Sequence, residues 1–168
     1  MIILGIDPGS LITGYGVVEE NGSRMRHLDS GIIAPRSKKD FSDRLHEIYH
    51  GLIEVFHKFK PDEVAIEEVF FAQNVRSALK LGEARGIALL AARNENIPLT
   101  SYSAREVKKA ISGYGQAGKE QVQKMVQALL KLPEPAQADA SDALAIAICH
   151  MNSRKMKNYD RAIGRKTR

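Results

Sequence analysis

Four acidic residues stand at positions where a carboxylate is costly unless it has a use. Two of them each follow a short apolar run, and two lie three residues apart at the start of the last apolar segment: Asp7, Glu67, Asp139 and Asp142. Residues three apart share one face of a helix, and functional groups of open α/β sheets gather at the carboxyl ends of strands. We therefore expect these four side chains to share one cleft.

Carboxylates crowded into one cleft repel each other, so that one has a raised pKa unless a cation intervenes. A divalent metal ion resolves the repulsion, and ligation by oxygen alone suits Mg²⁺ or Mn²⁺ better than Zn²⁺. Such ions, usually two together, polarise a phosphodiester and activate water for in-line attack. The sequence therefore predicts metal-dependent phosphodiester hydrolysis, with the four acids as both metal-binding and catalytic residues.

Each acid also has a purely structural interpretation. Asp7, before Pro8-Gly9-Ser10, is typical of a turn, and Asp139 or Asp142 suits an N-cap or the first turn of a helix. The run from Asp7 to Ser10 is also similar to the phosphate-binding loops of actin-like kinases and ATPases. A nucleotide-dependent kinase is therefore an alternative, weakened because such enzymes close two domains over the nucleotide and this chain has 168 residues.

Hydrophobic periodicity predicts the elements that must position these acids. We expect strands at 2–6, 14–20, 25–33, 64–66 and 99–102, with Asn21-Gly22 at a hairpin turn between the second and third. We expect helices between Asp40 and Pro61, at 75–96, from 103 onward, at 119–132 and at 138–152. A hairpin beside later β-α units predicts an α/β fold, a mixed five-stranded sheet with helices on both faces.

The predicted helix at 75–96 is apolar more than half-way round its circumference. A helix buried on two sides suits either a place between layers or the interface of a homodimer. A wholly intramolecular core helix is the alternative.

Basic and aromatic residues add candidates for nucleic-acid contact. Lysines flank the glycine-containing loop 113–118, which we interpret as a mobile loop because it follows a helical segment instead of a strand. Two aromatic residues follow the acid pair Glu67-Glu68, where they could stack on unpaired bases or pack in the core. The candidates for DNA contact are Phe70, Phe71, Arg76, Lys108, Lys109 and Lys119.

Charge is distributed unevenly along the chain, whose net charge is +5. Seven basic residues and one acidic residue lie in 153–168, which leaves 18 basic and 19 acidic residues in 1–152. We therefore expect a near-neutral domain at 1–152 and a basic, flexible tail at 153–168 that suits an anionic partner such as nucleic acid.

Other features exclude whole classes of protein. The single cysteine, Cys149, excludes an internal disulfide framework and a cysteine-rich zinc site. No apolar run approaches the roughly 18 residues that a membrane span needs. We expect a cytoplasmic protein with no membrane contact.

Several motifs, in order, closely resemble the RuvC family of bacterial Holliday junction resolvases. They span about residues 1–150 and include Gly5–Ser10, Thr13–Gly16, Ala65–Phe70, Ser77–Gly82, Leu129–Pro133 and Gln137–Ala145. The resemblance implies a ribonuclease H-like fold and a homodimeric, Mg²⁺-dependent endonuclease. Such enzymes nick two strands of like polarity symmetrically at a four-way DNA junction, during recombination and repair.

The resemblance also assigns roles to residues of this sequence. It implies a metal-binding acid tetrad at Asp7, Glu67, Asp139 and Asp142, lysines near the scissile phosphate at Lys108 and Lys119, and a junction-wedging aromatic at Phe70. It implies the branch-migration proteins RuvA and RuvB as partners and T-rich cut sites.

Three residues depart from the family pattern: Leu11 in place of Arg, Glu68 in place of Gln, and Gln73 in place of Lys. Because side chains alternate along a strand, only one of Glu67 and Glu68 can face the cleft, and we expect Glu67. A junction-binding module without catalysis is a further alternative, although a pure phosphate binder gains nothing from clustered carboxylates.

Overall fold

The computed structural model describes residues 1–22, 24–36, 40–68 and 74–162. Its described strands form one mixed sheet in the order β3-β2-β1-β4-β5. The strands are β1 (Ile2–Asp7), β2 (Thr13–Asn21), β3 (Arg24–Ile33), β4 (Glu63–Glu67) and β5 (Leu99–Tyr102). The first three pair antiparallel, while β4 and β5 run parallel to β1. The predicted mixed five-stranded sheet is confirmed.

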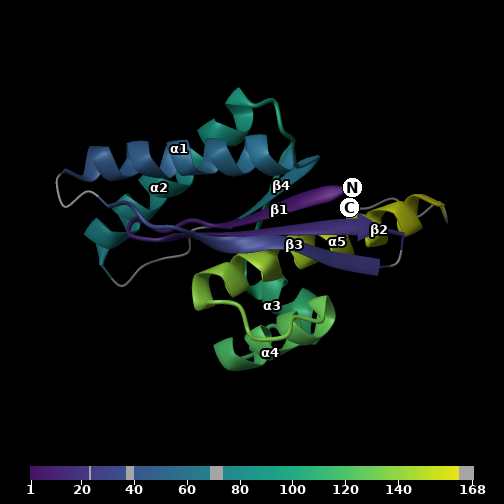
Figure 1. The fold of residues 1–168 in the computed structure, drawn as a ribbon. Coiled ribbons are helices and arrows are strands. Elements are labelled where there is room, and N and C mark those ends of the chain that lie inside the picture. Colours follow the sequence, from purple (N-terminus) through teal and green to yellow (C-terminus); the bar gives the residue numbers. More distant parts are fainter. Residues whose placement is uncertain (23, 37–39, 69–73, 163–168) are drawn as a thin grey trace.

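Helices cover both faces of this sheet (Figure 1). On one face lie α1 (Phe41–Phe59) and α2 (Val75–Asn94), and on the other α3 (Ala104–Ser112), α4 (Lys119–Leu130) and α5 (Ala138–Ala162). Ser103 caps α3 in the predicted capping box, in which its hydroxyl accepts from the Glu106 amide and the Glu106 carboxylate accepts from the Ser103 amide. None of the described helices is long and apolar enough to cross a membrane.

Alternation along the strands divides the core into two layers. Leu4 and Ile6 of β1 pack with α1 and α2, whereas Ile3 packs with α3, α4 and α5. In β4, Val64 and Ile66 face the α1 and α2 side, and Ala65 faces the α5 side. Residues at odd positions of both strands therefore point toward α5.

Close contact between α5 and the sheet depends on glycines. A Cβ atom on Gly5 would overlap the carbonyl oxygen of Ala143, and one on Gly14 would overlap that of Asp139. The missing side chains let the first turns of α5 lie directly against β1 and β2. This approach brings the start of α5 to the carboxyl end of β1.

The last helix is longer than predicted, because α5 continues without a break past residue 152 to Ala162. Ion pairs anchor this extension: Arg154 Nε lies 3.3 Å from Glu63 Oε1, and Lys155 Nζ lies 3.2 Å from Glu20 Oε1. Two basic residues that sequence analysis placed in a flexible tail therefore contact acids of the sheet.

Candidate active site

A cavity of about 270 Å³ opens where β1 and β4 end beside α5. Its polar lining consists of three carboxylates and two ammonium groups: Asp7, Glu67, Asp142, Lys108 and Lys119. Its apolar wall comes from α3, α4 and α5: Ala104, Val107, Val122, Ala145 and Ile146. Acidic and basic side chains from five separate elements, β1, β4, α3, α4 and α5, thus meet in one place.

The sheet accounts for the meeting of two of the acids. β1 and β4 are parallel neighbours with Ile6 opposite Ile66, so their last residues, Asp7 and Glu67, lie side by side at the same end of the sheet. Glu67 lines the cavity, whereas the side chain of Glu68 is exposed and is not part of that lining. The predicted choice of Glu67 over Glu68 therefore agrees with the geometry.

Burial and mutual repulsion perturb these carboxyl groups. Burial, followed by the charges of Glu67, Asp142 and Asp139, raises the pKa of Asp7 to about 8. Asp7 also forms a hydrogen bond with Glu67 that favours a proton on Asp7 and negative charge on Glu67. Burial and the neighbouring acids therefore disfavour ionisation of Asp7 in this cavity.

The other two cavity-lining groups follow the same pattern. Burial raises the pKa of Glu67, with the charge of Asp142 adding to the effect and those of Lys119 and Lys108 opposing it. Burial also raises the pKa of Asp142, against the lowering effect of Lys119 and Lys108. A bound cation would remove this penalty in all three groups.

Asp139 lies beside the cavity and is absent from its lining. It is half-buried in the first turn of α5, and its charge acts on both Asp7 and Asp142. The prediction that four acids share one cleft therefore holds for three of them, with the fourth within electrostatic reach. The helical spacing of three brings Asp139 and Asp142 to neighbouring positions without aiming both carboxylates into the cavity.

The cavity suits a hard divalent cation, because the ligands that its acidic side chains offer are all oxygen atoms. Within the described residues, no three acidic, histidine or cysteine side chains are grouped closely enough to enclose one ion. Asp7, Glu67 and Asp142 line one cavity without forming such a group.

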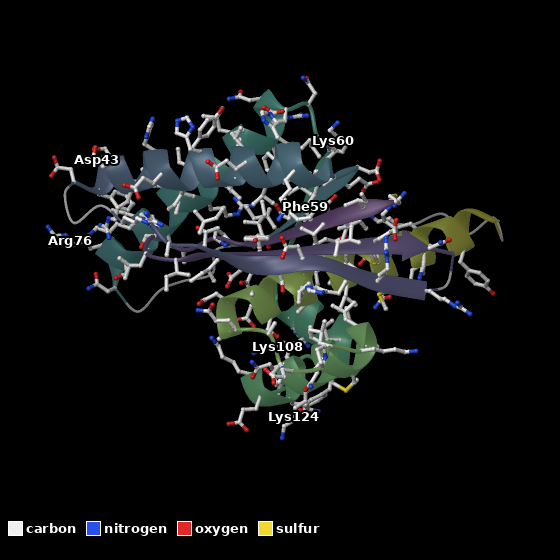
Figure 2. The ribbon with its side chains drawn as sticks, in the orientation of Figure 1. Asp43, Phe59, Lys60, Arg76, Lys108 and Lys124 are labelled. Atoms are coloured by element: carbon white, nitrogen blue, oxygen red, sulfur yellow. The ribbon has the colours of Figure 1, made fainter. Side chains whose placement is uncertain are left out.

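The two lysines line the cavity from different helices, and Figure 2 shows Lys108 on the side of the sheet that holds α3 and α4. Lys119 is the first residue of α4, and its Nζ lies 3.9 Å from Asp142 Oδ2 with its side chain 87% exposed. Lys109 is exposed and lines a separate groove between α3 and α5. Of the lysines flanking the glycine loop, Lys108 and Lys119 belong to the cavity and Lys109 does not.

Another predicted residue, Arg76, is not part of the cavity lining. Arg76 is exposed in the first turn of α2, at the far end of the molecule from Lys60 in Figure 2. Phe70, with Phe71 and Gln73, falls outside the described residues. Leu11 is exposed at 66% in the segment between β1 and β2.

Sequence analysis missed one polar contact with the end of β4. Arg85 of α2 donates from Nε to the carbonyl oxygen of Glu67 at 3.0 Å and from Nη2 to Ser101 Oγ at 2.7 Å. The available signal was its position between Ala84 and Ala88, because a guanidinium beside buried alanines needs polar partners.

Comparison with known proteins places this geometry in a family. The family model described as crossover junction endodeoxyribonuclease RuvC matches residues 3–150. Two relatives with that same name come from Geobacter metallireducens, at 56% identity, and Geobacter sulfurreducens, at 55% identity. Each alignment covers 97% of this chain and 99% of the relative.

Solved structures agree with the sequence relatives. RuvC of Thermus thermophilus in complex with a Holliday junction substrate superposes with a TM-score of 0.88 at 37% identity, over 94% of this chain and 96% of that one. A structure described as the yeast mitochondrial Holliday junction resolvase Ydc2 has a TM-score of 0.69 at 18% identity, covering 96% of this chain and 83% of that one. The latter likeness shows a shared fold.

Proposed function

Because this chain belongs to the RuvC family of crossover junction endodeoxyribonucleases, we propose that it resolves Holliday junctions in recombination and DNA repair. The reaction is hydrolysis of one phosphodiester in each of two strands of like polarity, placed symmetrically about the junction. The observation that carries the proposal is the cavity at the carboxyl ends of β1 and β4, where half-buried acids with raised pKa meet two lysines.

The family is one of metal-dependent nucleases, and the proposed ions are Mg²⁺, two per site, with Mn²⁺ as a substitute. Asp7, Glu67 and Asp142 would hold them, with Asp139 beside the cavity as a further ligand. Bound there, the ions would polarise the phosphodiester and lower the pKa of the attacking water. The raised pKa of each lining carboxyl supports this assignment, because a cation makes the ionised form favourable.

The lysines have a separate task in this proposal. The side chain of Lys119 lines the cavity and is exposed, so its ammonium group can contact the scissile phosphate. There it would offset the negative charge that develops on the phosphate oxygens. Lys108 lines the same cavity from α3 and would neutralise a second phosphate oxygen. Phe70 is proposed as the junction-contacting aromatic and Arg76 as a backbone contact, both by family resemblance.

A homodimer would place two such sites on a substrate with two-fold character. The support is the outer face of α2, where large apolar residues are exposed: Val75 at 77%, Leu79 at 62% and Leu90 at 51%. We also propose that RuvA and RuvB are partners and that the protein acts in the bacterial cytoplasm. Residues 153–168 are proposed to form a basic extension of a domain at 1–152 and to contact DNA.

A direct test is incubation of an end-labelled four-way junction with the protein and Mg²⁺, beside a linear duplex of the same sequence. Paired symmetric nicks in the junction alone are expected. Binding without nicks would favour an inactive junction-binding module, and tight ATP binding without junction affinity would favour an actin-like kinase; either outcome would contradict the proposal.

A further inference from the structure

The side chain of Arg85 joins the ends of the two strands next to the cavity. Its Nε donates to the carbonyl oxygen of Glu67, and its Nη2 donates to the hydroxyl of Ser101, at 3.0 and 2.7 Å. Ser101 lies in β5 opposite Ile66 of β4. Because a guanidinium is planar with its donors at fixed angles, these two bonds set the spacing between the strand ends.

The carbonyl of Glu67 lacks a partner within the sheet. The pairing of β1 with β4 ends at Ile6 and Ile66, and in a parallel ladder the next donor toward Glu67 would be the N–H of residue 8. That residue is Pro8, which has no N–H. Arg85 supplies the donor that Pro8 cannot.

The other edge of β4 ends one residue later. The Glu68 amide donates to the carbonyl oxygen of Tyr102 at 2.8 Å, after which the Ser103 amide donates to Glu106 Oε2 at the start of α3. The ladder between β4 and β5 therefore stops beside Glu67, at a point where strand ends fray easily.

We propose that Arg85 is a positioning residue, which fixes the carboxylate of Glu67 in the cavity by holding the main chain of that residue to α2. The inference rests on the proposed function, in which Glu67 is a metal ligand. Arg85 is half-buried and is not part of the cavity lining. It acts through the backbone on one side of the sheet, while the Glu67 carboxylate faces the α5 side.

The arrangement has a consequence for α2. The same helix exposes Leu79 and Leu90 to the proposed subunit partner. A shift of α2 along the sheet would pull on the Glu67 carbonyl through Arg85, so the position of a metal ligand depends on where α2 sits. Cleavage at the two active sites of the proposed homodimer would then depend on how this helix packs.

The test compares Arg85→Ala, Arg85→Lys and Ser101→Ala in the full chain. Arg93→Ala is the matched control, an exposed arginine on the same helix. Three measurements are made: Mn²⁺ affinity by electron paramagnetic resonance without DNA, hydrogen exchange of the Glu68 amide, and single-turnover junction cleavage against Mg²⁺ concentration. Junction affinity in EDTA is measured in parallel.

Arg85→Ala is expected to weaken Mn²⁺ binding and to raise the Mg²⁺ concentration for half-maximal cleavage by about tenfold, as loss of a residue that orients a ligand does. Exchange of the Glu68 amide should accelerate, while junction affinity stays at the wild-type value. Arg85→Lys should recover part of the metal affinity, Ser101→Ala should lose less than Arg85→Ala, and Arg93→Ala should match wild type.

Unchanged Mn²⁺ affinity and Glu68 exchange in Arg85→Ala would overturn the inference, as would a loss of junction affinity with metal binding intact. If Arg85→Ala does not fold, the same measurements are made on Arg85→Lys and Ser101→Ala. Wild-type Mn²⁺ affinity in both of these variants would overturn the inference. A wild-type protein that binds Mn²⁺ but never nicks junctions would instead contradict the proposed function. Those two failures are therefore distinguishable.

Discussion

Lys119 Nζ lies 3.9 Å from Asp142 Oδ2, across the mouth of the cavity from α4 to α5. The two side chains differ in freedom, since that of Lys119 is 87% exposed and that of Asp142 is 35% exposed. The exposed lysine partly offsets the burial that raises the pKa of Asp142. A substrate phosphate entering the cavity would therefore compete with Asp142 for the same ammonium group.

Lys119→Met is expected to slow single-turnover cleavage by about 100-fold, because it removes a charge that stabilises the transition state. Junction affinity should fall by less than about threefold, since one phosphate contact contributes little to total binding. The matched control is Lys124→Met, on the same helix and outside the cavity lining. Equal losses in both variants would mean that only general positive charge matters.

Asp7→Asn is expected to abolish cleavage and, in the metal-free protein, to raise stability at pH 8 by about 1–3 kcal/mol. The folded-state pKa of Asp7 is about 8 against an ordinary 3.8. The folded protein therefore binds more protons than the unfolded chain between those values, and wild-type stability falls as pH rises through that window. Asparagine removes this cost.

Urea denaturation with and without Mg²⁺ measures the effect. At pH 5 residue 7 is neutral in the folded state of both wild type and Asp7→Asn. The difference between their free energies of unfolding should therefore be smaller than at pH 8. Added Mg²⁺ should stabilise wild type more than Asp7→Asn. A variant less stable than wild type at pH 8 without metal would contradict the prediction.

His150→Ala is expected to lower the free energy of unfolding by about 2–4 kcal/mol. His150 is buried, with Nδ1 2.9 Å from the Tyr102 hydroxyl and Nε2 2.7 Å from Glu63 Oε2. Removal leaves a cavity and takes one hydrogen-bond partner from the Tyr102 hydroxyl and one from the Glu63 carboxylate. The exposed His46 provides the control, because His46→Ala should change stability by less than about 0.5 kcal/mol.

His150 also predicts a pH dependence. Burial lowers its pKa, with the charge and hydrogen bond of Glu63 opposing the effect. The unfolded chain then takes up the proton at a higher pH than the folded protein does. The stability that His150 contributes is therefore present above its ordinary pKa and is lost as the pH falls below it, a slope that His150→Ala should abolish.

Gly5→Ala is expected to destabilise the protein by about 1–3 kcal/mol and to weaken metal binding. The added Cβ would overlap the Ala143 carbonyl oxygen and lie 2.8 Å from the Ala147 amide nitrogen, which forces α5 away from β1. Asp142 would move away from Asp7. In the control Gly82→Ala, nothing lies within 4 Å of the new Cβ, and thermal denaturation should show a gain of about 0.5–1 kcal/mol.

Leu79→Glu is expected to convert the proposed homodimer to a monomer, because it places a charge on the exposed apolar face of α2. Sedimentation equilibrium measures the mass. Met156→Glu is the control, since Met156 is exposed at 68% on α5, away from α2. Monomeric wild-type protein at micromolar concentration would contradict the proposed assembly.

Local sequence patterns were sufficient to predict much of the fold and the main acidic residues of the candidate site. Alternation along β4 predicted that only one of Glu67 and Glu68 faces the cleft, and the family pattern pointed to Glu67, which lines the cavity together with Asp7. The capping box at Ser103 and Glu106 was also predictable, because it depends on residues three apart. Each of these features follows from short-range geometry.

The tertiary structure decided which candidates face the cavity. Spacing alone could not separate Lys108 from Lys109, or show that Asp142 lines the cavity while Asp139 does not, because both depend on how α3 and α5 pack on the sheet. The ion pairs of the α5 extension join it to Glu20 and Glu63, residues more than 80 positions away in the chain, which no local pattern could have predicted.

The role inferred for Arg85 shows the same division. The sequence by itself determined that Pro8 has no N–H and that Arg85 stands directly after Ala84 and three residues before Ala88. Only the packing of α2 against β4 and β5 brought that guanidinium to the Glu67 carbonyl. Periodicity specifies which face of an element is apolar, whereas contacts between polar groups distant in the chain depend on the docking of whole elements, which no local pattern encodes.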